Sequence, residues 1–248
     1  MIQLEYLRVR WRVVIYLAIV LAAVVLAQIS AGHSHVDVNG QEAHAGNIPL
    51  AAVIFGSGFV AAAFGAFLAS LNALDDTLPS LWTKPVPRER MAISIIAVDL
   101  LAILTVWAGT FALVLVAFAG LGLMSHLFVD PMASGAVWLG LATAFMCYGN
   151  VQALTAWHQG KGGMIAGIAF GSYFVLVILG GAPLQGLLHN LVMTLNICNP
   201  LAYLGISSHN DEARALFKFN DDLKIAIMFT IGIVGCAIGV FGWKRMEI

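Results

Sequence analysis

The sequence predicts an all-α integral membrane protein with six transmembrane helices. It also predicts a short cytoplasmic helix between the second and third spans and a re-entrant helical hairpin on the outer side before the sixth. Composition is the first observation behind this fold class, since 60% of the 248 residues are hydrophobic and only 10% are charged. A soluble domain carries about 25% charged residues. The second observation is that the hydrophobic residues, which give a mean hydropathy of +0.91, form long runs, and the third is that Lys and Arg lie between only some of these runs.

The apolar runs give the number of spans. A transmembrane helix needs about 20 apolar residues, because each residue adds about 1.5 Å and the hydrocarbon core is about 30 Å thick. Only loops separate the runs, so residues 1–248 form a single transmembrane domain. The predicted spans are Val13–Ile29, Pro49–Leu71, Leu100–Met124, Ala136–Trp157, Gly162–Ala182 and Leu223–Trp243.

The N-terminal run also has features of a signal peptide, because a basic start precedes its apolar residues. Val13–Ile29 is longer than a usual signal-peptide core, and the residues that follow, Ser30–His35, form no convincing cleavage site. We therefore predict a retained first span.

Lys and Arg predict the orientation, because loops on the cytoplasmic side carry an excess of them. They precede the first span and follow the second, fourth and sixth, whereas the loops Gly32–Ile48 and Ser125–Gly135 contain none. Both termini are therefore predicted to be cytoplasmic. The cations on this side are Arg8, Arg10, Arg12, Lys84, Arg88, Arg90, Lys161, Lys244 and Arg245.

The segment Leu184–Ile206 is apolar enough for a seventh span, which would place the C-terminus outside. Five of its residues suit lipid poorly, namely His189, Asn190, Asn196, Asn199 and Pro200. Proline within a span also breaks the helix and frees backbone groups that lipid does not satisfy. We therefore predict two short apolar pieces around Asn196–Pro200, forming a re-entrant hairpin, with the seven-span topology as the alternative.

The stretch Asp75–Arg90, DDTLPSLWTKPVPRER, separates the second span from the third. Asp75 or Asp76 can cap a short helix that Pro85 ends, because the residue before a proline disfavours helical geometry. The helix carries one apolar stripe, made of Leu78, Leu81 and Trp82. Its plainest role is that of a basic loop against lipid headgroups. Two prolines around one valine and a capped helix of fixed length favour a surface presented to a protein partner.

These residues resemble the signature of the ABC type-two permeases, in which Gly-Thr-Leu is followed by a Leu and then by Pro-Val-Ser-Arg. Here Asp76 stands in place of the glycine and Pro87 in place of the serine. The run Asn199–Tyr203, NPLAY, is similar to the Pro-Leu-x-Tyr element before the last span of that family. The matching residues after the second span are Thr77, Leu78, Leu81, Lys84, Pro85, Val86 and Arg88.

The resemblance implies a membrane-spanning permease subunit of an ATP-driven transporter, usually an exporter, in the plasma membrane (the inner membrane of a bacterium). Two permease chains pair in the lipid bilayer, and each docks a separate ABC ATPase subunit that binds ATP and magnesium. The permease itself would bind no cofactor and would not be an enzyme. The coupling residues that contact the ATPase would be Thr77, Leu78, Leu81, Trp82, Lys84, Pro85, Val86, Pro87 and Arg88. The outer hairpin would hold Asn196, Asn199, Pro200 and Tyr203.

Other features are weaker candidates for a site. The sequence has no GxxxxGK[ST] loop, so ATP hydrolysis by that route needs another polypeptide, and we expect no nucleic-acid partner. His33, His35 and His44 are weak candidate metal ligands, because their spacing matches no tight ligand motif and a solvated loop explains them. Asp99 is an intramembrane acid, for which we expect a structural role, either hydrated or bonded to Asn72.

Two other functions stay open. An ion-gradient-driven secondary transporter would normally show paired buried charges or broken helices near mid-membrane, and only Asp99 approaches that pattern. An intramembrane serine protease has less support, because nothing places a base beside either serine site, Ser57 or Ser207-Ser208-His209. Co-purification with an ATPase would separate the permease from both alternatives.

Overall fold

The computed structural model of the chain describes residues 2–33, 48–72, 87–158, 161–180, 182, 184–204 and 221–245. This described part contains seven α-helices, two 3-10 helices and two strands of two residues each. In chain order these are α1 (Ile2–His33), β1 (Ile48–Pro49), α2 (Leu50–Asn72), α4 (Arg88–Gly120), η1 (Leu123–His126), β2 (Leu127–Phe128), α5 (Ala133–Thr155), α6 (Gly162–Gly180), α7 (Gly186–Ile197), η2 (Pro200–Leu204) and α9 (Asp221–Arg245).

Six of these helices are long and apolar enough to cross a membrane, which indicates a multi-pass membrane protein. They are α1, α2, α4, α5, α6 and α9, so the predicted number of spans is confirmed. Helix α7 has only 12 residues and is too short to be a seventh span by itself.

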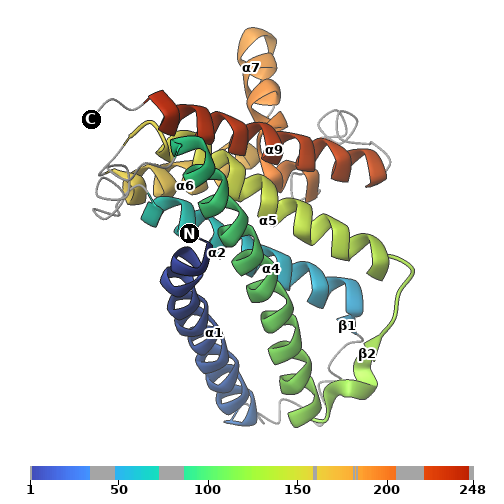
Figure 1. Cartoon of the computed structure of the whole chain (residues 1–248). Helices are drawn as coiled ribbons and strands as arrows, with labels where there is room; N and C mark the ends of the chain where they lie inside the picture. The colour runs from blue at the N-terminus through green and yellow to red at the C-terminus, as the bar shows by residue number, and fades with distance from the viewer. Residues whose placement is uncertain are drawn as a thin grey trace.

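Helix α5 lies between α2 and α9, with which it makes its most extensive contacts (Figure 1). Helix α4 crosses these three, and α1 runs beside α4 in the same direction (Figure 1). We call the end of the bundle where β1 pairs with β2 the strand end. The opposite end is the ion-pair end, where Lys244 in the last turn of α9 pairs with Glu89 in the first turn of α4.

Glycines bring the three central helices close together. A side-chain carbon placed on Gly58 of α2 would lie 2.5 Å from the Cα of Gly140 in α5. One placed on Gly149 of α5 would lie 2.9 Å from the Cα of Gly232 in α9. Helices in lipid associate mainly through such close packing, because lipid tails are as apolar as the side chains. These two contacts, which we call the glycine seams, hold α5 against both neighbours.

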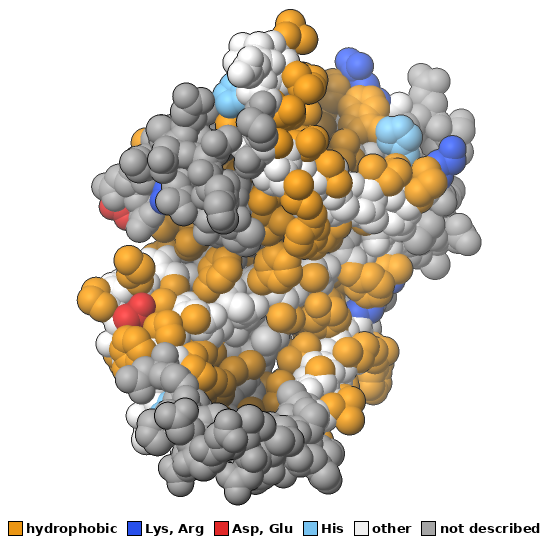
Figure 2. Space-filling view, turned by 180° about the vertical axis from the view of Figure 1, so that it is seen from behind, with side chains coloured by type: hydrophobic (Ala, Val, Ile, Leu, Met, Phe, Trp, Pro, Cys, Tyr) orange, Lys and Arg blue, Asp and Glu red, His pale blue; other side chains and the backbone are white. Residues whose placement is uncertain are grey.

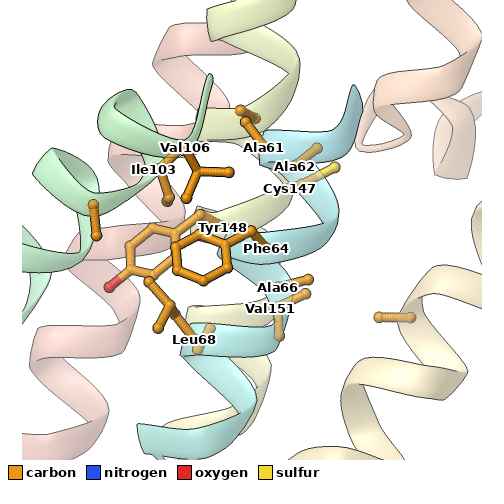
Figure 3. Close-up of a cluster of buried hydrophobic side chains, with 14 of the residues drawn as sticks. Ala61, Ala62, Phe64, Ala66, Leu68, Ile103, Val106, Cys147, Tyr148 and Val151 are labelled. Carbon is orange, nitrogen blue, oxygen red and sulfur yellow. The ribbon is translucent and has the colours of Figure 1, made fainter. Parts of the chain in front are cut away.

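The largest buried cluster lies where α2, α4 and α5 meet. Figure 3 shows Phe64 of α2 beside Tyr148 of α5, with Ile103 and Val106 of α4 close by. Tyr148 is fully buried, and its hydroxyl is the oxygen seen in that view. A buried phenol hydroxyl usually has a hydrogen-bond partner, and that of Tyr148 is the carboxylate of Asp99 on α4.

Helix α4 differs most from its predicted span, Leu100–Met124, because it starts at Arg88 and ends at Gly120. Charged residues interrupt the apolar run before Leu100, but the helix continues through them. It ends earlier than predicted because Gly122 adopts a left-handed backbone with φ of 69°, which suits glycine and commonly follows a helix. The strands were not predicted, since pairs of two residues show no periodicity.

The predicted interruption of Leu184–Ile206 is confirmed. Helix α7 ends at Ile197, and a 3-10 helix starts at Pro200. Figure 1 shows α7 projecting away from the other helices, and four of its leucines are largely exposed: Leu187, Leu188, Leu191 and Leu195. We call residues Ile197–Tyr203, where the chain turns between these two pieces, the elbow.

Candidate functional site

Asp99 is the centre of a hydrogen-bonded cluster inside the apolar bundle. Its Oδ2 atom accepts a hydrogen bond of 2.6 Å from Nδ2 of Asn72 and one of 2.9 Å from the hydroxyl of Tyr148. All three side chains are buried almost completely. Of the two roles expected for Asp99, hydrated or bonded to Asn72, the structure shows the bond to Asn72, and Tyr148 is a further partner that was not predicted. We call these three residues the Asp99 cluster.

The Asp99 cluster joins three helices at one point. Asn72 is the last residue of α2, Asp99 lies about three turns into α4, and Tyr148 belongs to α5. Helices α2 and α4 flank the predicted coupling residues in the sequence, so the cluster fixes both of them against α5. Hydrogen bonds in a medium of low dielectric are strong, and losing one partner leaves a buried polar group unsatisfied.

A second network holds the elbow. The Nδ2 atom of Asn199 donates to the carbonyl of Tyr173 and to Oδ1 of Asn196, both at 2.9 Å. Its Oδ1 atom accepts a bond of 3.0 Å from the backbone N–H of Leu201. A helix break exposes backbone groups that lipid does not satisfy. The Asn199 side chain therefore satisfies one backbone group at the break, the N–H of Leu201, and ties the elbow to α6 through the Tyr173 carbonyl.

The elbow lies alongside α6 rather than beyond its end. Asn196 donates to the carbonyl of Leu176 at 3.1 Å, and Asn199 reaches Tyr173. Tyr173 comes seven residues before Gly180, where α6 ends, which corresponds to about 10 Å along the helix. The break in the chain is therefore held about two turns inside the strand end of α6.

Tyr203 closes the elbow on itself. Its hydroxyl donates to the carbonyl of Ile197 at 2.9 Å. A tyrosine hydroxyl keeps its proton at neutral pH, so it is a donor here. Tyr203 also packs with Ala142 and Met146 of α5 and Met228 of α9. The predicted hairpin residues are thus brought together by the structure, and the bonds they make are structural.

Helix α5 reaches the elbow through Asn150. Its Nδ2 atom donates to the carbonyl of Cys198 at 2.8 Å and to the hydroxyl of Tyr173 at 3.1 Å. The sequence analysis missed Asn150 and Tyr173. The available signal was a polar side chain within an apolar run, which in membranes often bonds to a neighbouring helix.

No protein-family model, no curated protein and no solved structure matches the chain. The resemblance to the ABC type-two permeases therefore stays a prediction.

Most of the predicted coupling residues, Thr77–Val86, lie outside the described residues. Pro87 immediately precedes α4, and its carbonyl accepts bonds from the N–H groups of Arg90 and Met91 at 3.0 and 3.3 Å. Glu89 pairs with Lys244 of α9. The first turn of α4, which follows the coupling residues directly, therefore contacts the last turn of α9 at the ion-pair end.

The described residues give no structural support to the other sites predicted from the sequence. His33 ends α1, while His35 and His44 lie outside the described residues. Within the described ranges, no three His, Cys, Asp or Glu side chains gather as a metal site requires. Ser57 is buried, and its hydroxyl donates to the carbonyl of Val53 in its own helix at 2.9 Å.

A pocket of about 440 Å³ opens at the strand end between α2 and α5. Its walls are mostly apolar, and Asp130 beside it accepts a bond of 3.2 Å from the N–H of Ala51. Such a pocket suits an apolar group rather than a charged one. The lining includes Ala51, Phe55, Met132, Ser134 and Leu139.

Proposed function

We propose that this chain is the membrane-spanning permease subunit of an ABC transporter, most simply an exporter, driven by ATP hydrolysis in a separate subunit. The observation that carries the proposal is the elbow. The residues that resemble the family's Pro-Leu-x-Tyr element, Asn199–Tyr203, form one hydrogen-bonded unit that precedes the last apolar helix in the sequence. The six apolar helices and the helix break at the predicted place also support it.

In this proposal the segment between α2 and α4 is the coupling element, and it docks into the ATPase. The Asp99 cluster supports this role, because it joins α2 and α4, the helices on either side of the segment, to each other and to α5. A coupling segment transmits force only if the helices that it connects are held in place. ATP and magnesium would be bound by the partner and not by this chain.

The orientation that we propose places the ion-pair end in the cytoplasm. In the described part, the starts of α4 and α6 and the end of α9 all contribute cations to this end: Arg90, Lys161, Lys244 and Arg245. Figure 2 shows most of the visible Lys and Arg atoms on its right-hand side, with a largely hydrophobic surface between them and the opposite end. This distribution agrees with the excess of cations in cytoplasmic loops. The elbow would then form a re-entrant hairpin that enters from the outer side.

Cysteine labelling tests this orientation. A Cys at position 39, introduced as Asn39→Cys, should react with a membrane-impermeant maleimide added to the outside of intact cells. A Cys at position 247, introduced as Glu247→Cys, should react only after the membrane is opened. The chain without either substitution controls for labelling of its own cysteines. Labelling of position 247 from outside would support the seven-span topology instead.

We further propose that two permease chains pair along α6. Gly163, Gly167 and Gly171 recur at every fourth residue of this helix and are exposed. Apart from the adjacent backbone of α6 itself, no atom of the described residues lies within 4 Å of a side-chain carbon placed on Gly167 or Gly171. Small residues with this spacing let transmembrane helices approach closely. The glycine seams show that the same packing is used inside the chain.

The double variant Gly167→Leu/Gly171→Leu should therefore lower the dimer fraction at least about tenfold, because two large side chains would keep the helices apart. Light scattering in mild detergent and cross-linking in native membranes measure this fraction. Gly56→Leu is the matched control, since Gly56 is equally exposed on α2 and also has no neighbour within 4 Å. An unchanged dimer fraction in the double variant would mean that lipid covers this face.

The experiment that tests the proposed function is affinity purification of the intact chain from membranes, followed by identification of co-purifying proteins. We expect an ATPase with a GxxxxGK[ST] loop in about equal amount. If none is found under conditions that preserve the membrane complex, the permease proposal fails. The buried Asp99 favours an ion-gradient-driven transporter as the second candidate, and that transporter would work without any ATPase.

A further inference from the structure

We propose that α5 mechanically couples the ends of α2 and α4 to the elbow, through Tyr148 on one side of the helix and Asn150 on the other. The inference goes beyond the proposed function, because it concerns communication within the chain and needs neither an ATPase nor a substrate. It rests on five hydrogen bonds and on the packing of the segment of α5 that lies between them.

The first side of the link is the Asp99 cluster. One carboxylate oxygen, Oδ2 of Asp99, accepts from both Asn72 of α2 and Tyr148 of α5. A displacement of α2 or α4 therefore acts on the Tyr148 hydroxyl directly. Since the cluster is buried, a broken bond has no water nearby to replace it, which makes the arrangement costly to distort.

The second side of the link is the elbow network. Asn150 donates to the carbonyl of Cys198 at the helix break and to the hydroxyl of Tyr173 on α6. Tyr173 in turn offers its backbone carbonyl to Asn199. The position of Asn150 therefore sets where the chain leaves α7 and where η2 begins.

The two sides meet within three residues of α5. Tyr148 and Asn150 are separated by about 200° around the helix and about 3 Å along it, so they point to opposite sides at nearly the same level. Gly149 lies between them and is pressed against Gly232 of α9. This part of α5 has no room to deform locally, so a displacement on one side is passed to the other.

The chain contains a natural reporter for this link. Cys198 is a free, exposed thiol within the elbow, and its own carbonyl is the atom that Asn150 holds. Cys147 is buried and Cys236 is partly buried. The rate at which N-ethylmaleimide modifies Cys198 in the full-length chain, followed by peptide mass spectrometry, therefore reports how firmly the elbow is held.

Tyr148→Phe removes one hydroxyl and Asp99→Asn removes one charge, both at the Asp99 cluster, whereas the Cys198 carbonyl is held by Asn150. We expect each variant to raise the Cys198 modification rate about twofold to tenfold, the range that corresponds to one hydrogen bond. Asn150→Ala, which cuts the link at the elbow itself, should raise it at least as much. Adding Tyr148→Phe to Asn150→Ala should then have little further effect, because the link is already broken.

Two controls separate coupling from loss of stability. Val106→Ala shortens a fully buried side chain of the same core cluster without removing a hydrogen bond. Ser57→Ala removes a buried hydroxyl that bonds within its own helix. Neither should change the Cys198 rate. If Asp99→Asn does not fold, Tyr148→Phe decides alone. The proposal is overturned if Asn150→Ala raises the rate while Tyr148→Phe leaves it unchanged, or if Val106→Ala raises it equally.

Discussion

The Gly149→Leu variant should fail to fold into a stable bundle. A side-chain carbon at this position would lie 2.9 Å from the Cα of Gly232, and closer still to its carbonyl oxygen. Overpacking usually costs about 1–3 kcal/mol. Here the obstacle is backbone rather than a flexible side chain, so we expect a loss above about 3 kcal/mol. The monodisperse fraction in gel filtration and the thermal unfolding of the purified protein measure it.

Gly56→Leu provides the matched control for this prediction, because no atom lies within 4 Å of a side-chain carbon there. It should be purified in the same yield as the unchanged protein and unfold at nearly the same temperature. Gly149→Ala should give an intermediate loss, since a single methyl group already meets Gly232. Normal stability of Gly149→Leu would show that α5 and α9 do not pack as described.

The Trp82→Ala variant should lose most of its affinity for the ATPase while it still inserts and folds. Trp82 lies outside the described residues, and the expectation comes from the apolar stripe that it completes with Leu78 and Leu81 in the sequence. Buried tryptophans are frequent anchors of protein interfaces, and their truncation commonly costs about 2 kcal/mol or more. That corresponds to about a thirtyfold loss of affinity, which pull-down of the ATPase and its hydrolysis rate would reveal.

Lys84→Gln is the control at the same surface. An exposed charge contributes only about 0–1 kcal/mol to an interface, so this variant should retain the ATPase. If Trp82→Ala binds the ATPase normally and supports the same hydrolysis rate, the stretch Asp75–Arg90 acts only as a topology signal. That outcome would be compatible with the proposed permease but would exclude a coupling role for this stretch.

The number of spans, the break before the last span and the bond between Asn72 and Asp99 could be predicted from the sequence. Each follows from a strong local rule. A long apolar run has no stable place except lipid or a large core, a proline ends a helix, and a buried carboxylate needs a donor. These rules do not depend on how the helices are arranged in space.

Tyr148, Asn150 and Tyr173 could not be assigned in advance, because their partners are distant in the sequence. Asn150 and the Cys198 carbonyl, for example, belong to α5 and to the elbow. Their meeting depends on how close α5 comes to its neighbours, and the glycine seams set that approach. Twenty-five glycines in an apolar chain indicate close packing, but they do not say which glycine faces which.

The glycine seams also limit the kinds of motion that the protein can make. A helix locked on two sides by backbone contacts can neither rotate about its axis nor slide without opening both seams. Helices α2, α5 and α9 should therefore tilt together as one rigid plate, and any hinge has to lie outside it. Any movement of α4 or of the elbow against the plate then acts on the hydrogen bonds that join them to α5, in the Asp99 cluster and at Asn150. Collective movements of packed helices take microseconds to milliseconds, so movements of α4 or of the elbow against the plate are expected on that timescale.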